Sequence, residues 1–365
     1  MPELIENPKE NSSMRINEGK VVLNFKETPR ENQGSLSGGY PHIVRDKVFW
    51  RLDHPREIAY AVEKNGKYEK PTNNILLKNS LAVENFKVFY DTKSGIPEEE
   101  LYKAVGGYHT GKHPMLIDCS FSKGLNITTY PNPVWPDEPK LLFDDDFFHP
   151  RHANGLYVFV SSDGINWKEY SQKPVLSVFR ETLDEDGRIL PKGTLGLDWM
   201  PSVFFDHNVE KYVIYLRANI SLGCRAVLYS YSDDLLSWTT PRLIKCDPEF
   251  DKQNKQNFYY PGIYPLGKKY ISFTPHFYNK IINSDGSDRL YLNECTKVMV
   301  SDNGTDWKVV EGIFNVKMNK HMYQPHVVTF REENGMHVIY TNEGWQTQNS
   351  RMIRYEVDLG GLFEW

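Results

Sequence analysis

The sequence has no long apolar run, and its cationic residues form no cluster. No stretch approaches the roughly 18 apolar residues that a membrane span needs, and the first 20 residues are polar, without the apolar core of a signal peptide. These absences predict a cytoplasmic protein with no membrane partner. The net charge of −5 argues against nucleic acid as a partner, because such binding depends on cations that neutralise phosphates.

Cysteine pairs and regular metal-ligand spacings are also missing. None of the four cysteines lies in a CxxC motif, so neither a zinc site nor a disulfide framework is predicted: Cys119, Cys224, Cys246 and Cys295. Asp144 to Asp146, with His149 and His152, resemble a ligand set. Consecutive carboxylates alternate in direction along an extended chain, however, and are more typical of a solvated turn. We therefore expect no metal and no cofactor.

Helical periodicity is absent as well, whereas aromatic and turn-forming residues are abundant. No run of a dozen residues repeats its apolar positions every 3.6 residues. Aromatic residues make up 13% of the chain, with 25 Gly and 22 Pro, which favours short strands joined by many turns. Aromatic faces stack on sugar rings as well as filling a β-rich core, so this enrichment fits both explanations.

A repeated pattern runs through the chain. Alternating apolar residues are closed by Ser, Asp or Asn, and then Trp in residues 155–167, 225–238 and 296–307. The three tryptophans lie about 70 residues apart, and each segment predicts a strand that enters a tight turn. Upstream, the motifs WMPSV, YYPGI and YQPHV share an aromatic residue, a proline and a β-branched residue.

These repeats predict an all-β fold, a five-bladed β-propeller. Four units of about 60 to 70 residues are visible, and three strand-like runs in residues 40–65 supply a degenerate fifth. An irregular β-sandwich is the alternative. We expect an N-terminal arm at residues 1–34 and one propeller domain at 35–365, with a long insertion at about 110–154 over the functional face.

Blade topology predicts which side chains share that face. Adjacent strands are antiparallel, so the start of the first strand, the end of the second and the start of the third lie together. Aromatic residues, arginines, histidines and carboxylates occupy these places. The candidate substrate-binding residues are Asn85, His109, Trp199, Arg217, Arg225, Tyr259, His276 and Tyr323. Asp91 and Asp206, at first-strand ends, fall on the opposite face as turn-forming residues.

The blade motifs resemble the five-bladed propeller superfamily of glycoside hydrolase families 32, 43, 68 and 117. Segments such as GLYVFVSSDGINW and LDWMPSVFFDHNVEKYVIYLRA are similar, more closely, to a group of poorly characterised bacterial proteins classed with the glycosyl hydrolases. The likeness covers roughly residues 75–345 and implies a carbohydrate substrate. The family 43 and family 32 catalytic triplets are not present: Met200-Pro201 and Tyr260-Pro261, for example, stand at inner-strand places where family 43 has Asp-Pro or Glu-Gly-Pro.

Glycoside cleavage needs one protonated carboxyl group and one ionised carboxylate. Asp198 is the candidate base or nucleophile, with Glu343 or Glu294 as the acid and Glu84 in reserve. Two other functions stay open. The cluster of Arg217, Arg225 and His276 suits an anion, as in a glycoside phosphorylase or sugar transferase. The missing triplets suit a non-catalytic carbohydrate-binding propeller.

Overall fold

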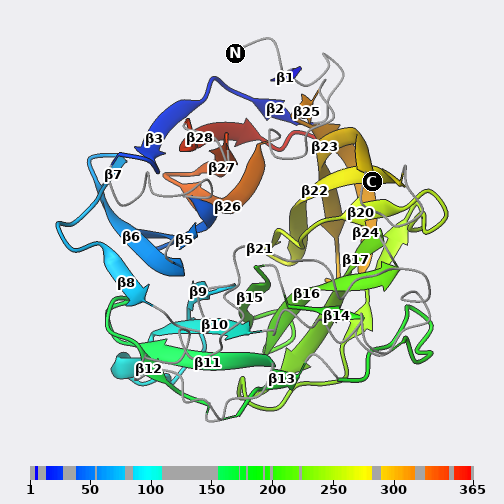
Figure 1. Cartoon of the computed structure of the whole chain (residues 1–365), viewed down its shortest axis with the longest axis horizontal. Helices are drawn as coiled ribbons and strands as arrows, with labels where there is room; N and C mark the ends of the chain where they lie inside the picture. The colour runs from blue at the N-terminus through cyan, green and yellow to red at the C-terminus, as the bar shows by residue number, and fades with distance from the viewer. Residues whose placement is uncertain are drawn as a thin grey trace.

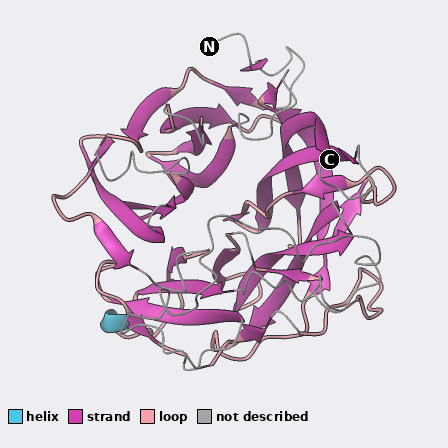
Figure 2. Ribbon diagram, in the orientation of Figure 1, coloured by secondary structure: helices cyan, strands magenta, loops and turns pink. Residues whose placement is uncertain are grey.

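The computed structural model is built almost entirely of strands (Figure 2). Its one described helical segment is a short 3₁₀ turn, Glu98–Glu100. The structure describes residues 5–6, 14–27, 38–53, 56–78, 85–108, 155–171, 173–177, 180–191, 194–197, 200–221, 224–281, 289–316, 325–344 and 349–362. The predicted insertion at 110–154, with Asp144 to Asp146, His149 and His152, lies outside these residues.

Four-stranded antiparallel runs are arranged around a centre (Figure 1). The first blade consists of β4 (Gly39–Val44), β5 (Lys47–Asp53), β6 (Arg56–Lys64) and β7 (Lys67–Glu69). The second consists of β9 (Lys87–Tyr90), β10 (Tyr102–Tyr108), β11 (Gly155–Ser161) and β12 (Lys168–Glu169). The first blade, which the sequence predicts as degenerate, is therefore complete.

Two further blades join in one sheet. The third consists of β15 (Ser202–Asp206), β16 (Lys211–Ser221), β17 (Cys224–Ser232) and β18 (Arg242–Leu243). The fourth consists of β21 (Ile263–Leu266), β22 (Lys269–Ile281), β23 (Arg289–Ser301) and β24 (Asp306–Ile313). They are connected by β20 (Gln256–Phe258), which pairs with both β17 and β22, and by β19 (Lys245–Asp247), which pairs with β24.

The fifth blade joins the two ends of the described chain. It contains β26 (His326–Glu333), β27 (Met336–Glu343) and β28 (Arg351–Asp358). Its outer edge is formed by β2 (Arg15–Ile16) and β3 (Lys20–Asn24), which both pair antiparallel with β28 (Figure 1). Ring closure, which the sequence leaves open, is thus made by strands from the segment predicted as an N-terminal arm.

Short strands extend these sheets. They are β8 (Ile75–Lys78) on β6, β13 (Leu176–Ser177) on β11, β14 (Leu195–Gly196) on β16, and β1 (Ile5–Glu6) paired with β25 (Asn315–Val316). An apolar cluster fills each boundary between neighbouring blades. Five such boundaries, including the one between the fifth and first blades, confirm the predicted five-bladed ring and exclude a sandwich.

Hydrogen bonds between inner strands also connect the blades. Each is donated by a backbone N–H of one inner strand to a side chain of the preceding one. Val88 N donates to His42 Nε2 at 2.9 Å, and Ile43 N donates to Thr329 Oγ1 at 2.9 Å. The second of these bonds links the fifth blade to the first, and so supports the closed ring.

The predicted tight turns are confirmed. In each, a serine hydroxyl accepts two backbone N–H bonds, and the tryptophan Nε1 donates to the carbonyl three residues earlier, at 3.2, 2.9 and 3.0 Å for Trp167, Trp238 and Trp307. The residue that supplies this carbonyl is left-handed in all three turns. Glycine takes that conformation freely, and in the second turn Leu235 adopts it with φ of 68°.

The two aspartates at first-strand ends form turns, as predicted. Asp91 accepts a bond from Lys93 N at 3.0 Å, and Asp206 accepts one from Asn208 N at 2.9 Å. Each also accepts a tyrosine hydroxyl from the next blade, Tyr212 at 2.7 Å and Tyr270 at 2.6 Å. These carboxylates therefore hold neighbouring blades together.

Candidate functional site

The starts of the inner strands surround a small hollow at the centre of the ring, and this end of the ring is named the channel mouth. Four blades contribute to the lining of the hollow, which consists of Tyr40, Pro41, Met200, Tyr260, His326, Val328 and Asn342. Its volume of about 10 Å³ suits a single water molecule. Asn342 Nδ2 donates to Gly38 O at 2.8 Å, whereas its buried Oδ1 accepts no hydrogen bond from the described residues.

Two arginines share one aromatic ring near this mouth. The guanidinium carbons of Arg217 and Arg225 lie 5.5 and 5.1 Å from the centre of the Tyr259 ring. Arg217 belongs to β16 and Arg225 to β17, and Tyr259 precedes β21. Arg225 also donates to Asn257 Oδ1 at 2.9 Å. Cation–π contacts of this kind fix the position of the guanidinium groups, so the predicted proximity of these three residues is borne out by the geometry.

His276 lies in the same region and is held on several sides. The side chain is buried, and the ring lies 5.0 Å from that of Tyr278 and 5.8 Å from that of Phe258. Gln256 Nε2 is 3.1 Å from His276 Nε2, and Cys295 Sγ is 3.8 Å from Nδ1. A register shift in β22 separates His276 from Tyr278, and this irregularity accompanies the packing of their two rings against each other.

Both polar atoms of the Asn85 side-chain amide form hydrogen bonds with backbone groups. Its Nδ2 donates to Leu197 O at 2.6 Å, and its Oδ1 accepts from Gly107 N at 2.7 Å. The side chain is buried, and these two bonds give both of its polar atoms a hydrogen-bond partner. Asn85 thus positions Leu197, the residue that precedes Asp198 in the sequence.

Glu343 is held by groups of its own blade. Its Oε1 accepts from the Tyr355 hydroxyl at 2.6 Å and from Thr341 at 3.2 Å, and its Oε2 lies 3.7 Å from Arg351 Nη2. Burial and the Glu343 carboxylate raise the pKa of Tyr355 above its ordinary value. The hydroxyl therefore remains a proton donor to Glu343 over the ordinary pH range, and these contacts hold the Glu343 side chain in place.

Several predicted site residues fall outside the part of the chain that the structure describes. They are Glu84, His109, Asp198, Trp199 and Tyr323, and Gln324 falls there too. Glu294 belongs to β23, and its side chain lies outside the described part. The residues that the described structure brings together are Arg217, Arg225, Tyr259 and His276.

The first blade contributes residues that the sequence analysis missed. Arg51 lies near the end of β5, with its guanidinium carbon 4.3 Å from the centre of the Tyr40 ring, and Glu57 is the second residue of β6. Both are buried, at 5% and 1% exposure. These are the positions where the topological rule places functional groups, so applying that rule to residues 40–65 would have found them. Tyr40 is left-handed, with φ of 53°, which is uncommon outside glycine.

Membrane-spanning helices and metal-ligand clusters are both missing from the described part of the chain. None of its helices has the length and apolar character of a membrane span. Within the same residues, no three or more His, Cys, Asp or Glu side chains gather where they would hold a metal ion. Cys224, Cys246 and Cys295 form no disulfide with one another.

Comparisons with known proteins rest on structure. No family model and no curated protein sequence matches the chain. An N-acetylgalactosamine deacetylase from F. plautii, in complex with blood group B trisaccharide, is similar with a TM-score of 0.53 at 10% identity, over 96% of this chain and 98% of that one. An endo-arabinase from Bacteroides thetaiotaomicron VPI-5482 has a TM-score of 0.51 at 11% identity, over 92% and 97%.

A family 117 glycoside hydrolase from Zobellia galactanivorans is also similar, with a TM-score of 0.48 at 9% identity, over 94% of this chain and 90% of that one. At these identities the likeness concerns the fold. The chain shares its fold with the deacetylase and the endo-arabinase, and this fold is the β-propeller that the resemblance of its blade motifs implies.

Proposed function

We propose that this protein is a glycoside hydrolase that binds a terminal or branching sugar at the channel mouth. The observation that carries the proposal is the convergence of Arg217, Arg225, Tyr259 and His276, from two blades, on one region. Two hydrogen-bonding cations over an aromatic ring, with a histidine in the same region, suit a ligand with many hydroxyl groups. The unpartnered Asn342 Oδ1 adds a buried acceptor from a third blade of the described ring.

Asp198 is the proposed base or nucleophile. The segment that leads to it is fixed, because Asn85 holds Leu197 O at 2.6 Å. Catalysis requires that the reacting groups are held in position, and a fixed residue next to the catalytic carboxylate favours this. Arg217, whose backbone pairs with Gly196, would keep such a carboxylate ionised.

The acid is proposed to be Glu343 or Glu294, with Glu84 in reserve. A general acid must carry a proton at the start of the reaction. The contacts with Tyr355 and Arg351 hold the Glu343 side chain in one place, and a fixed position suits a group that must deliver a proton to the substrate.

The test is the release of sugar from a panel of aryl glycosides and oligosaccharides, including arabinan and blood group B trisaccharide. The Asp198→Asn variant is expected to lose at least about 10²-fold in kcat, as for removal of general acid–base catalysis. Asp233→Asn is the matched control, because the Asp233 side chain is 79% exposed and pairs only with Lys211 among described side chains. Equal activity of wild type and Asp198→Asn would reject the assignment.

A phosphorylase or transferase is the second candidate, because Arg217 and Arg225 bring two cations to one ring. Turnover that appears only when inorganic phosphate is added would favour it. Sugar binding without any turnover, with or without phosphate, would identify a carbohydrate-binding propeller instead.

A further inference from the structure

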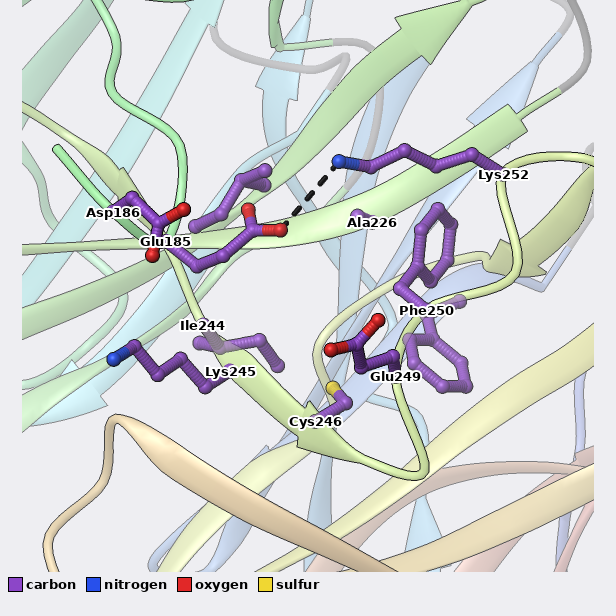
Figure 3. A pocket seen from close by; sticks show the side chains of 11 residues that line it. Glu185, Asp186, Ala226, Ile244, Lys245, Cys246, Glu249, Phe250 and Lys252 are labelled. Carbon is purple, nitrogen blue, oxygen red and sulfur yellow. Dashed lines mark ion pairs between the residues drawn. The ribbon is translucent and has the colours of Figure 1, made fainter. Parts of the chain in front are cut away.

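A pocket of about 380 Å³ lies between the third and fourth blades and shares no lining residue with the hollow at the channel mouth (Figure 3). Its lining comes from β17 to β20 and from two irregular segments. The lining residues are Glu185, Asp186, Ala226, Leu243, Ile244, Lys245, Cys246, Glu249, Phe250, Lys252 and Phe258. The volume is at the small end of the roughly 300–1,000 Å³ typical of small-molecule sites.

One wall is a turn that carries Glu185 and Asp186. Asp184 Oδ1 accepts bonds from the backbone N–H of Asp186 at 2.9 Å and of Arg188 at 2.8 Å. Arg242 donates to the carbonyls of Asp184 and Glu185 at 3.3 and 2.9 Å. The turn is therefore fixed to β18, which holds the backbone that carries Glu185 and Asp186 in place.

The opposite wall is the loop that precedes β20. Asp251 accepts two bonds from Asn254, and Gln256 Oε1 accepts Asp251 N at 2.7 Å. These bonds order the loop that carries Phe250 and Lys252. The Phe250 ring packs against that of Phe258 with 5.6 Å between centres, which gives the pocket an aromatic wall.

The charges of the pocket nearly cancel. Lys252 pairs with Glu185 at 3.5 Å, and Asp186 pairs with Arg188 at 3.3 Å. Glu249 and Lys245 are left, one of each sign, and neither side chain makes an ion pair or hydrogen bond with another described residue. Figure 3 shows the carboxylates of Glu185 and Glu249, the Lys252 amine and Phe250 around a common space. Burial raises the pKa of the Cys246 thiol to about 12, which disfavours the thiolate near neutral pH.

We propose that this pocket is a second carbohydrate-binding site, which takes a neutral sugar of one or two units. A sugar presents hydroxyl groups to donors and acceptors and an apolar C–H face to an aromatic ring. The pocket offers Glu249 as an acceptor, Lys252 as a donor and Phe250 as the apolar wall. A strongly charged ligand would gain almost no net electrostatic attraction, because the positive and negative charges of the pocket nearly cancel.

The pocket adjoins the channel mouth without sharing its polar groups. Ala226 and Phe258 line the pocket, whereas their neighbours Arg225 and Asn257 hydrogen-bond to each other beside Tyr259. A ligand in the pocket therefore contacts none of the residues proposed to bind sugar at the mouth. The proposal goes beyond the proposed hydrolase, and would hold even if the mouth proved non-catalytic.

The test is isothermal titration calorimetry of Asp198→Asn protein, which removes the proposed turnover, with galactobiose, xylobiose and arabinobiose. At least one disaccharide is expected to bind. Adding Phe250→Ala or Glu249→Gln is expected to weaken its binding at least about tenfold, which corresponds to roughly 1.4 kcal/mol. Glu249 is exposed and its replacement leaves the fold intact, so this variant remains informative if Phe250→Ala unfolds.

The matched controls are Tyr170→Ala and Glu98→Gln, exposed residues of the second blade outside the pocket. Both are expected to leave the affinity unchanged. The proposal is overturned if none of the three disaccharides binds, if binding resists both pocket substitutions, or if spermidine binds at the pocket and the disaccharides do not.

Discussion

At the scale of single residues, Lys87 and His42 form a basic pair on neighbouring inner strands. His42 accepts the Val88 N–H at Nε2, which leaves Nδ1, 3.3 Å from Tyr40 O, as the donor of a neutral imidazole. Burial, and then the Lys87 charge, lower the pKa of His42 well below its usual value. Burial also lowers the pKa of Lys87 from 10.5 to about 7. The propeller thus contains a lysine, Lys87, whose lowered pKa places the loss of its proton near neutral pH.

Lys87→Met is expected to stabilise the protein at pH 7. The unfolded lysine keeps its proton up to about pH 10.5, whereas the folded one loses it above about pH 7. Between these values the unfolded state binds more protons, so wild-type stability rises with pH by at most about 1.4 kcal/mol per unit from this group. The advantage of Lys87→Met should therefore shrink from pH 7 to pH 9.

Urea unfolding of wild type and Lys87→Met at pH 7, 8 and 9 measures this difference. Lys64→Met is a control, because Lys64 is an exposed residue paired with Glu69 at 2.8 Å. A Lys87→Met difference that stays constant with pH would contradict the lowered pKa.

At the scale of structural elements, the same aspartate–tyrosine hydrogen bond joins adjacent blades at two places in the ring. The carboxylate at the end of an inner strand closes its own turn with one oxygen, and accepts a tyrosine hydroxyl from the following blade with the other. A hydrogen bond to a charged acceptor in a buried place is stronger than a neutral one. The position of each second strand thus depends on the preceding blade.

Tyr212→Phe and Tyr270→Phe are each expected to lower the free energy of unfolding by about 1.5–3 kcal/mol, because a buried carboxylate loses its donor. Tyr231→Phe is the control, since no described group hydrogen-bonds to the Tyr231 hydroxyl. Denaturant unfolding of the three variants compares them. Losses for Tyr212→Phe and Tyr270→Phe no greater than that of Tyr231→Phe would show that the bonds do not stabilise the fold.

At the scale of the whole molecule, the ring depends on β3. This strand covers the edge of β28, and Val22, Leu23 and Phe25 are buried between the fifth and first blades. The Phe25 ring lies 5.5 Å from the Trp50 ring. An uncovered β28 would expose unpaired backbone groups along a full strand, so closure also protects the protein from pairing with other chains.

Phe25→Ala is expected to cost about 3–5 kcal/mol, as for a phenylalanine in a well-packed core. Val21→Ala on the same segment is the control, because Val21 is 38% exposed and surface changes usually stay within about 0.5 kcal/mol. Thermal and urea unfolding measure both. Similar small losses for the two variants would show that β3 does not close the ring in solution.

The sequence by itself determined the repeat. The spacing of serine, aspartate or asparagine, and tryptophan in each repeat identifies an outer turn. These side chains form hydrogen bonds to groups within four residues along the chain, as Trp167, Trp238 and Trp307 show. Alternating apolar residues fix the strands between them. The topological rule then placed Arg217, Arg225, Tyr259 and His276 in one region, because antiparallel strands return to the same face.

Only the tertiary structure decided how those elements meet. β3 pairs with β28 across more than 300 residues of chain, and no local pattern specifies such a contact. The position of Asn85 is typical of a substrate-binding residue, yet its side-chain amide hydrogen-bonds to the backbone of Leu197 and Gly107. The pocket beside Phe250 is formed by two segments, residues 180–191 and 248–256, that have no repeat and meet only when the third and fourth blades pack together.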